Sequence, residues 1–190
     1  MISLTPQNFI ALMDERRYPI FREETFKPYN LNIIGIRNKF GRVNHFDDVI
    51  CVYLEKEGKW VQHDFPATTY PGLPSLFKPV NPKGTAILKP GQYRYRLGLH
   101  KNKYPALIQD APVTVYRDNN KNLVYDLDHR KEESGFFGIN IHRASLGAKL
   151  VGADSAGCQV IKEGFDRFMS LINAALRYRE NSFVYTLVEL

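Results

Sequence analysis

Short strand-like segments separated by turn signals occupy most of this chain of 190 residues. Residues 48–55 and 59–65 flank Lys56-Glu57-Gly58 and predict a β-hairpin. Further strands are predicted at residues 31–36, 92–99, 112–117, 123–126, 135–142 and 183–188. Tyr and Phe, with 11 and 12 copies, favour the same structure, because aromatic side chains suit strands. The chain is therefore expected to be mostly β.

Two helices and several loops complete the predicted organisation. Thr5 followed by Pro6 is typical of a helix start and predicts a short N-terminal helix that ends at about Arg16. Apolar residues at helical spacing predict a longer helix over residues 162–178 that packs on the sheet. Proline and glycine mark residues 66–90 as loop. The length fits a single domain, residues 1–190.

The net charge of +6 fits an acidic polymer as partner: nucleic acid, an anionic membrane surface or an acidic cell wall. No dense block of Lys and Arg occurs, so a diffusely basic, solvated surface is the alternative. Neither a signal-peptide pattern nor a membrane span is visible, which predicts synthesis in the cytoplasm. Of the two cysteines, Cys51 lies in an apolar run typical of a buried thiol, although a disulfide with Cys158 stays open.

The tetrapeptide Ser155-Ala156-Gly157-Cys158 and the upstream His142 carry the chemistry of this sequence. A thiol and an imidazole suffice for cysteine-based acyl transfer, because the imidazole can take the thiol proton. The backbone N–H groups of Gly157 and Cys158 are candidates for an oxyanion hole. The predicted helix directly after Cys158 would favour the thiolate through its N-terminus. The alternative is an inert, buried cysteine.

The residues around this pair are expected to line a cleft. Strand alternation puts Asn140 and His142 on one face of residues 135–142, and this face is small and polar. Arg143 is a candidate clamp for a substrate carboxylate. Ser155 is expected either to orient His142 or to support the loop. Four residues are thus predicted to bind substrate: Asn140, Arg143, Ser155 and Ala156.

Other polar clusters give weaker signals, and no metal or cofactor is expected. Three histidines stand alone near loops or strand ends, where surface or structural roles are favoured: His45, His63 and His100. Asp126, Asp128 and His129 lack a diagnostic zinc spacing. The segment at residues 118–122 imitates a calcium loop but lacks its glycine and glutamate, so a hairpin turn is preferred and a cation stays the alternative.

The histidine strand and the cysteine motif resemble the catalytic domain of the L,D-transpeptidase (YkuD-like) family. Ile139-Asn140-Ile141-His142 matches the family's histidine strand, and residues 155–158 match its Ser/Thr-His-Gly-Cys motif. The resemblance covers residues 83–190, whereas residues 1–80 match only loosely. Ala156 stands where the family has histidine, and Arg143 where it often has Gly or Ser. The chain is therefore similar to a divergent, bacteriophage-like branch.

The resemblance implies a β-sandwich-like fold and a cysteine acyltransferase acting on peptidoglycan stem peptides. Cys158 would attack the carbonyl of an L-centre that is followed by a D-amino acid, and His142 would move the protons. The thioester would pass to an amine or to water. Such a protein would act on the cell wall after release, without nucleic acid as a partner. Two alternatives stay open: an inactive wall-binding or phage structural module of the same fold, and an unrelated cysteine protease acting on proteins.

Overall fold

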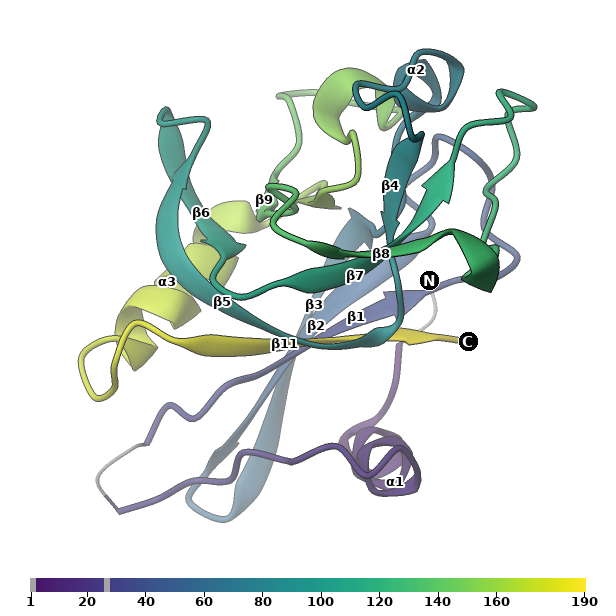
Figure 1. The fold of residues 1–190 in the computed structure, drawn as a ribbon. Coiled ribbons are helices and arrows are strands. Elements are labelled where there is room, and N and C mark those ends of the chain that lie inside the picture. Colours follow the sequence, from purple (N-terminus) through teal and green to yellow (C-terminus); the bar gives the residue numbers. More distant parts are fainter. Residues whose placement is uncertain (1–2, 26–27) are drawn as a thin grey trace.

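The computed structural model describes residues 3–25 and 28–190, in which eight strands close into a mixed barrel (Figure 1). Around the barrel the order is β1 (Asn32–Arg37), β11 (Phe183–Glu189), β5 (Gly91–His100), β6 (Tyr104–Gln109), β9 (Ile141–Arg143), β10 (Gln159–Ile161), β3 (Lys59–Thr68) and β2 (Asp48–Lys56). The pairs β1–β11 and β9–β10 are parallel, and the other neighbours are antiparallel. The prediction of a mostly β chain is confirmed, with a closed barrel as its main sheet.

A smaller antiparallel sheet and short helices surround the barrel. The sheet has the order β4 (Thr85–Leu88), β7 (Val113–Asp118) and β8 (Glu132–Gly135). The helices are α1 (Pro6–Glu15), α2 (Leu73–Phe77) and α3 (Phe165–Ala175), with 3-10 turns η1 (His129–Lys131) and η2 (Gly152–Asp154). None of the helices in the described part of the chain combines the length and the hydrophobicity that a membrane span requires.

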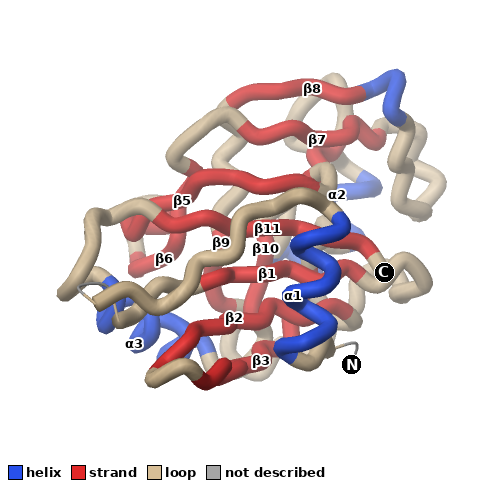
Figure 2. The backbone as a smooth tube through the Cα atoms, turned by 90° about the horizontal axis from the view of Figure 1, so that it is seen from below, coloured by secondary structure: helices blue, strands red, loops and turns tan. Residues whose placement is uncertain are grey.

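Strand β2 is buried on both faces, which explains its unbroken apolar run. Ile50, Val52 and Leu54 belong to the main core of the barrel. The alternating residues Val49, Cys51 and Tyr53 belong to a second core beneath α1, which lies across the outside of the barrel (Figure 2). Alternation of side chains along a strand thus joins the two apolar layers.

Both predicted helices occur, and each covers an apolar layer. The Thr5 side chain accepts a hydrogen bond from the Asn8 N–H at 3.3 Å and caps α1. From α1, the Phe9 ring stacks on Tyr53 with centroids 4.3 Å apart. Helix α3 buries its apolar stripe in the main core, where Phe168 meets Phe65 edge-on.

Several predicted segments differ from the structure. Residues 123–126 form no strand, so residues 118–122 do not close a hairpin; β7 pairs with β8 instead. The predicted loop at residues 66–90 contains α2 and β4. The predicted strand at residues 135–142 is split, because Gly138 takes a φ of +68° between β8 and β9. A strand, β10, stands between Cys158 and α3, so the prediction that a helix directly follows the cysteine is wrong.

A buried polar network ties β1 and β2 to the segment after β3. Arg37, 0% exposed, donates to the Thr69 hydroxyl at 2.9 Å and to the Thr69 carbonyl at 2.8 Å. The Asp48 carboxylate accepts from the Thr69 N–H and hydroxyl at 2.7 and 2.8 Å. Residues 70–72 then lead to Gly72, whose N–H donates to the Ser155 carbonyl at 2.9 Å. The network therefore anchors the loop that precedes Cys158.

Candidate active site

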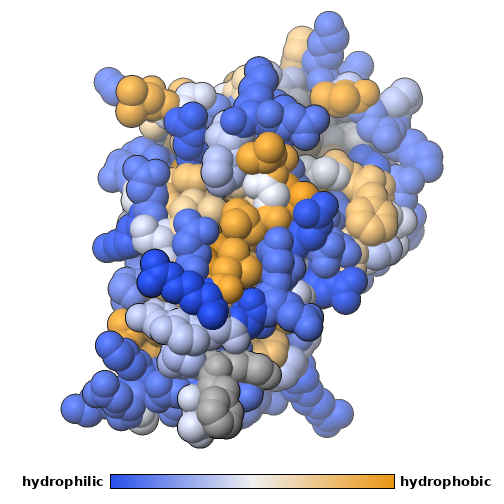
Figure 3. Space-filling view, turned by 90° about the vertical axis from the view of Figure 1, so that its left-hand side faces the viewer, coloured by the Kyte–Doolittle hydropathy of each residue, from blue (hydrophilic) through white to orange (hydrophobic). Residues whose placement is uncertain are grey.

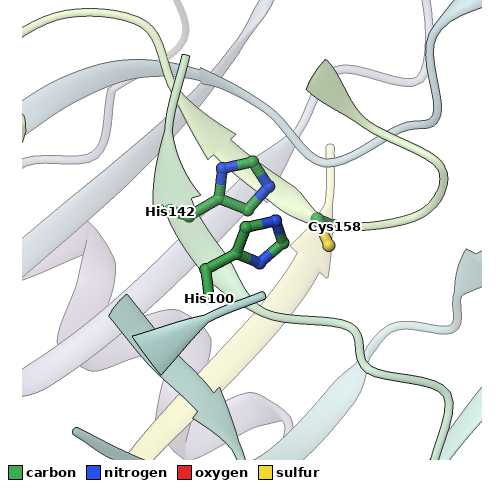
Figure 4. Close-up of side chains that lie close together, drawn as sticks. All are labelled: His100, His142 and Cys158. Carbon is green, nitrogen blue, oxygen red and sulfur yellow. The ribbon is translucent and has the colours of Figure 1, made fainter. Parts of the chain in front are cut away.

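Parallel pairing of β9 and β10 brings the predicted cysteine and histidine together. The register joins His142 to Val160 and Ile141 to Gln159, so Cys158 lies beside Asn140. The ring of His142 rises from β9 next to Cys158, and the end of β5 adds the ring of His100 (Figure 4). One side-chain ligand atom from each of these three residues lies within 4.8 Å of the other two. The structure therefore gathers a thiol and two imidazoles.

His142 is held in the tautomer that a general base needs. Its Nδ1 lies 2.8 Å from the Arg143 carbonyl oxygen, which only accepts hydrogen bonds, so Nδ1 carries the proton. The Tyr104 hydroxyl lies 3.2 Å from the same nitrogen. Nε2 is buried and has no hydrogen-bond partner among the described residues. Its lone pair is thus free to take a proton from a neighbouring thiol.

Both members of the pair are uncharged at rest near neutral pH. Burial lowers the pKa of His142 to about 4, against the opposing effect of its bond to the Arg143 carbonyl. Burial also raises the pKa of the Cys158 thiol, while the Asn140 N–H and the charge of Lys101 lower it. A free thiolate–imidazolium pair is therefore not the resting state, and proton transfer accompanies attack on a substrate.

The Cys158 sulfur has backbone neighbours on one side. It accepts a hydrogen bond from the Asn140 N–H and donates one to the Gly138 carbonyl, both at 3.5 Å. Cys158 is partly exposed as a residue but its side chain is buried with those of His100 and His142, and it is a free cysteine, as is the buried Cys51. The thiol is thus fixed in place, and no disulfide consumes it.

The loop before Cys158 is built by hydrogen bonds of Ser155. The Ser155 hydroxyl donates to the Cys158 carbonyl at 2.8 Å and accepts from the Gly157 N–H at 3.2 Å. Ser155 is fully buried, so it supports the loop instead of facing a substrate. The Gly157 N–H is also occupied, which leaves the Cys158 N–H as the candidate oxyanion donor.

Glycine is required at position 157 for two reasons. Its φ is +133°, a backbone conformation that residues with a side chain rarely adopt. A Cβ there would also come within 2.6 Å of the Ala86 carbonyl oxygen of β4. Residues 66–90, which were predicted to be loop, therefore supply strand β4, and the loop before Cys158 packs against this strand.

Two cavities flank the cysteine loop and include the other predicted substrate-binding residues. One of about 330 Å³ is lined by Ala156 together with Phe136, Phe137 and Arg117. The other, of about 250 Å³, is lined by Tyr104, Arg143, Ser145 and Asp154, among others. The exposed Arg143 guanidinium lies 4.7 Å above the Tyr104 ring.

The Asn140 side chain contacts the cluster at His100, because its Nδ2 lies 3.1 Å from His100 Nδ1. His100 is 5% exposed, and its ring stacks on His142 with centroids 4.0 Å apart. The prediction that His100 stands alone is therefore wrong. The sequence feature that could have indicated the position of His100 is the turn Lys101-Asn102-Lys103. This turn connects β5 to the unpredicted β6 and puts His100 opposite Tyr104.

The three clustered side chains carry donor types that suit zinc, and they form the one possible metal group found among the described residues. Donor atoms around a tetrahedral zinc lie about 3.3–3.6 Å apart, so the cluster would have to contract. A metal-bound histidine normally donates its other ring N–H to an acceptor. His142 does so, whereas the Nδ1 of His100 faces the amide nitrogen of Asn140. The cluster therefore fits a thiol–imidazole pair better than a metal centre.

The remaining candidate residues lie apart from this cluster. His129 Nδ1 lies 2.7 Å from a carboxylate oxygen of Glu132, and His45 Nδ1 lies 2.8 Å from the Val43 carbonyl oxygen. Asp118 is buried and accepts from the Asp126 N–H at 3.2 Å. These groups are engaged in local contacts.

Comparison of the chain with protein-family models, curated proteins and solved structures gives no match.

Proposed function

We propose that the protein is a cysteine acyltransferase or peptidase of L,D-transpeptidase type that acts on peptidoglycan stem peptides. The observation that carries the proposal is the pairing of Cys158 with a buried His142 whose Nε2 has no partner among the described residues. The finer assignment of the barrel to the L,D-transpeptidase catalytic fold belongs to the same proposal. Synthesis in the cytoplasm and release toward the wall are also part of it.

The reaction proceeds in two acyl transfers. The Cys158 sulfur attacks the peptide carbonyl as its proton passes to His142 Nε2, and the Cys158 N–H donates to the developing oxyanion. The C–N bond then breaks, and the imidazolium returns the proton to the leaving amine. An amine or water next attacks the thioester, gives its proton to His142 and releases the thiol, which takes that proton back.

Positive charge near the site supports an anionic substrate. Arg143 lines one flanking cavity, and Lys101 is close enough to affect the pKa values of His142 and Cys158. A stem peptide offers carboxylates, which an arginine fork can bind. The face that carries the β5–β6 hairpin is hydrophilic around its rim and has an apolar strip at its centre (Figure 3).

The second candidate is an inactive wall-binding or structural module with the same fold. It is supported by Ala156, which is exposed and offers no hydrogen-bonding side chain at the position where the resembled family has histidine. A cysteine protease acting on proteins is the weaker third reading, and digestion of casein without effect on peptidoglycan would favour it.

Cys158→Ala is expected to abolish the change that the wild-type protein makes in purified sacculi, because no other described thiol lies in the cluster. The test is analysis of muropeptides after incubation with each protein. Cys51→Ala is the matched control and should retain activity, since Cys51 is buried beneath α1. Identical muropeptides from wild type and Cys158→Ala would sink the peptidoglycan proposal and leave the inactive module and the cysteine protease, which the casein assay separates.

A further inference from the structure

The hydrogen bonds around His100 fix its tautomer. The Gln109 backbone N–H lies 3.3 Å from Asn140 Oδ1, and a backbone N–H only donates, so that atom of the amide is the oxygen. The other amide atom is then the NH₂ group, which donates to His100 Nδ1 at 3.1 Å. Because Nδ1 accepts, the proton of the neutral ring is on Nε2. Burial lowers the pKa of His100, which keeps the ring neutral.

The two stacked histidines therefore carry opposite tautomers. His142 bears its proton on Nδ1, directed at the Arg143 carbonyl, and keeps a lone pair on Nε2. His100 bears its proton on Nε2. Figure 4 shows the two rings side by side, each with a ring nitrogen turned toward the space beside the Cys158 sulfur. One ring thus offers an acceptor to this space and the other offers a donor.

We propose that the His100 Nε2–H donates a hydrogen bond to the Cys158 sulfur when the thiol loses its proton to His142. The inference rests on the proposed function, because it assigns His100 a step in forming the nucleophile. The proton moves from sulfur to His142 Nε2, and the N–H of His100 compensates the negative charge left on sulfur. No proton of His100 is transferred.

The thiolate needs such a donor. Burial disfavours charge on the sulfur, and the hydrogen bond from the Asn140 N–H is long, at 3.5 Å. A hydrogen bond to a charged group changes an equilibrium by about 10- to 100-fold. Asn140 is then a positioning residue: it holds the His100 tautomer through its side chain and meets the sulfur through its backbone.

Two variants separate the donor from the ring. His100→Phe keeps a ring to stack on His142 but removes the N–H, whereas His100→Gln keeps an N–H near the position of Nε2 and removes the ring. Both are made in Cys51→Ala, and alkylation of Cys158 by iodoacetamide is followed against pH with a chelator present. We expect His100→Phe to react at about one tenth of the parent rate or below at neutral pH, and to reach its half-maximal rate at a higher pH. The rate of His100→Gln should stay near that of the parent.

The other charged or titratable groups around the pair are the same in both variants. They are His142 on β9, Tyr95 on β5, Tyr104 on β6, Arg143 after His142, Lys101 in the turn after β5 and Asp154 in η2. A difference between the two variants therefore reports the group at position 100.

A parent-like rate in His100→Phe, or equal slowing in both variants, would overturn the inference. Nitrogen-15 spectra of labelled histidines give a second readout in the wild-type protein. They should assign His100 as the Nε2–H tautomer, and an Nδ1–H signal from His100 contradicts the proposal. Both readouts are independent of peptidoglycan, so they can fail while muropeptides still change, and they can succeed when muropeptides do not.

Discussion

His142→Gln is expected to slow acyl transfer to stem peptides by about 10²- to 10⁴-fold, the contribution typical of a general base. The glutamine amide cannot take the thiol proton, which His142 Nε2 is free to accept. Burial also lowers the pKa of His142 to about 4, so the wild-type ring is an unprotonated base throughout the neutral range. The measurement is the rate of peptide release by chromatography, at several pH values.

His63→Gln is the matched control for this variant. His63 lies on β3 and is absent from the cluster around Cys158, so its replacement should leave the rate within about twofold, as is usual for groups outside the chemistry. Circular dichroism and thermal unfolding establish that both variants fold. A His142→Gln protein that keeps wild-type activity would show that His142 is not the base.

Asp48→Ala is expected to lower the free energy of unfolding by about 2–6 kcal/mol, because two buried donors lose their acceptor and each unsatisfied donor costs about 1–3 kcal/mol. Arg37 is completely buried, and Asp48 faces it through Thr69, whose N–H and hydroxyl both donate to the carboxylate. Without the carboxylate, the two Thr69 donors lose their acceptor and the Arg37 guanidinium loses a nearby negative charge. Urea unfolding followed by fluorescence measures the loss.

The adjacent Asp47→Ala is the control, because Asp47 pairs at 3.3 Å with Arg42, whose side chain is 71% exposed. An exposed ion pair contributes about 0–1 kcal/mol, so the loss of unfolding free energy in Asp47→Ala should be several times smaller than that in Asp48→Ala. Equal losses from both variants would mean that the buried network adds no particular stability. A large loss in Asp48→Ala should also speed alkylation of Cys51, which lies on the same strand.

Local patterns predicted the elements whose partners are near in the sequence. The β2–β3 hairpin follows from the turn at residues 56–58, and α1 follows from Thr5 and Pro6. Strand β6 was missed, because Pro105 and the absence of glycine in the preceding turn hide a hairpin that long-range pairing stabilises. Barrel closure depends on β1 pairing with β11, a contact that no local pattern contains.

The same distinction applies to the candidate site. Cys158 and His142 were predicted as a pair, and parallel pairing of their strands brings them together. The role of Ser155 needed the structure, because its hydroxyl bonds within its own loop. His100 was not predicted, since its neighbours in space come from β6 and β9 and not from its own segment.

The most direct measurement is the mass of the protein after brief incubation with a purified stem peptide in which an L-centre precedes a D-amino acid, followed by acid quenching. We expect an added mass equal to the acyl portion of the peptide, carried as a thioester on Cys158 and absent from Cys158→Ala. An intact peptide with unmodified protein, or release of the D-amino acid by Cys158→Ala, would contradict it.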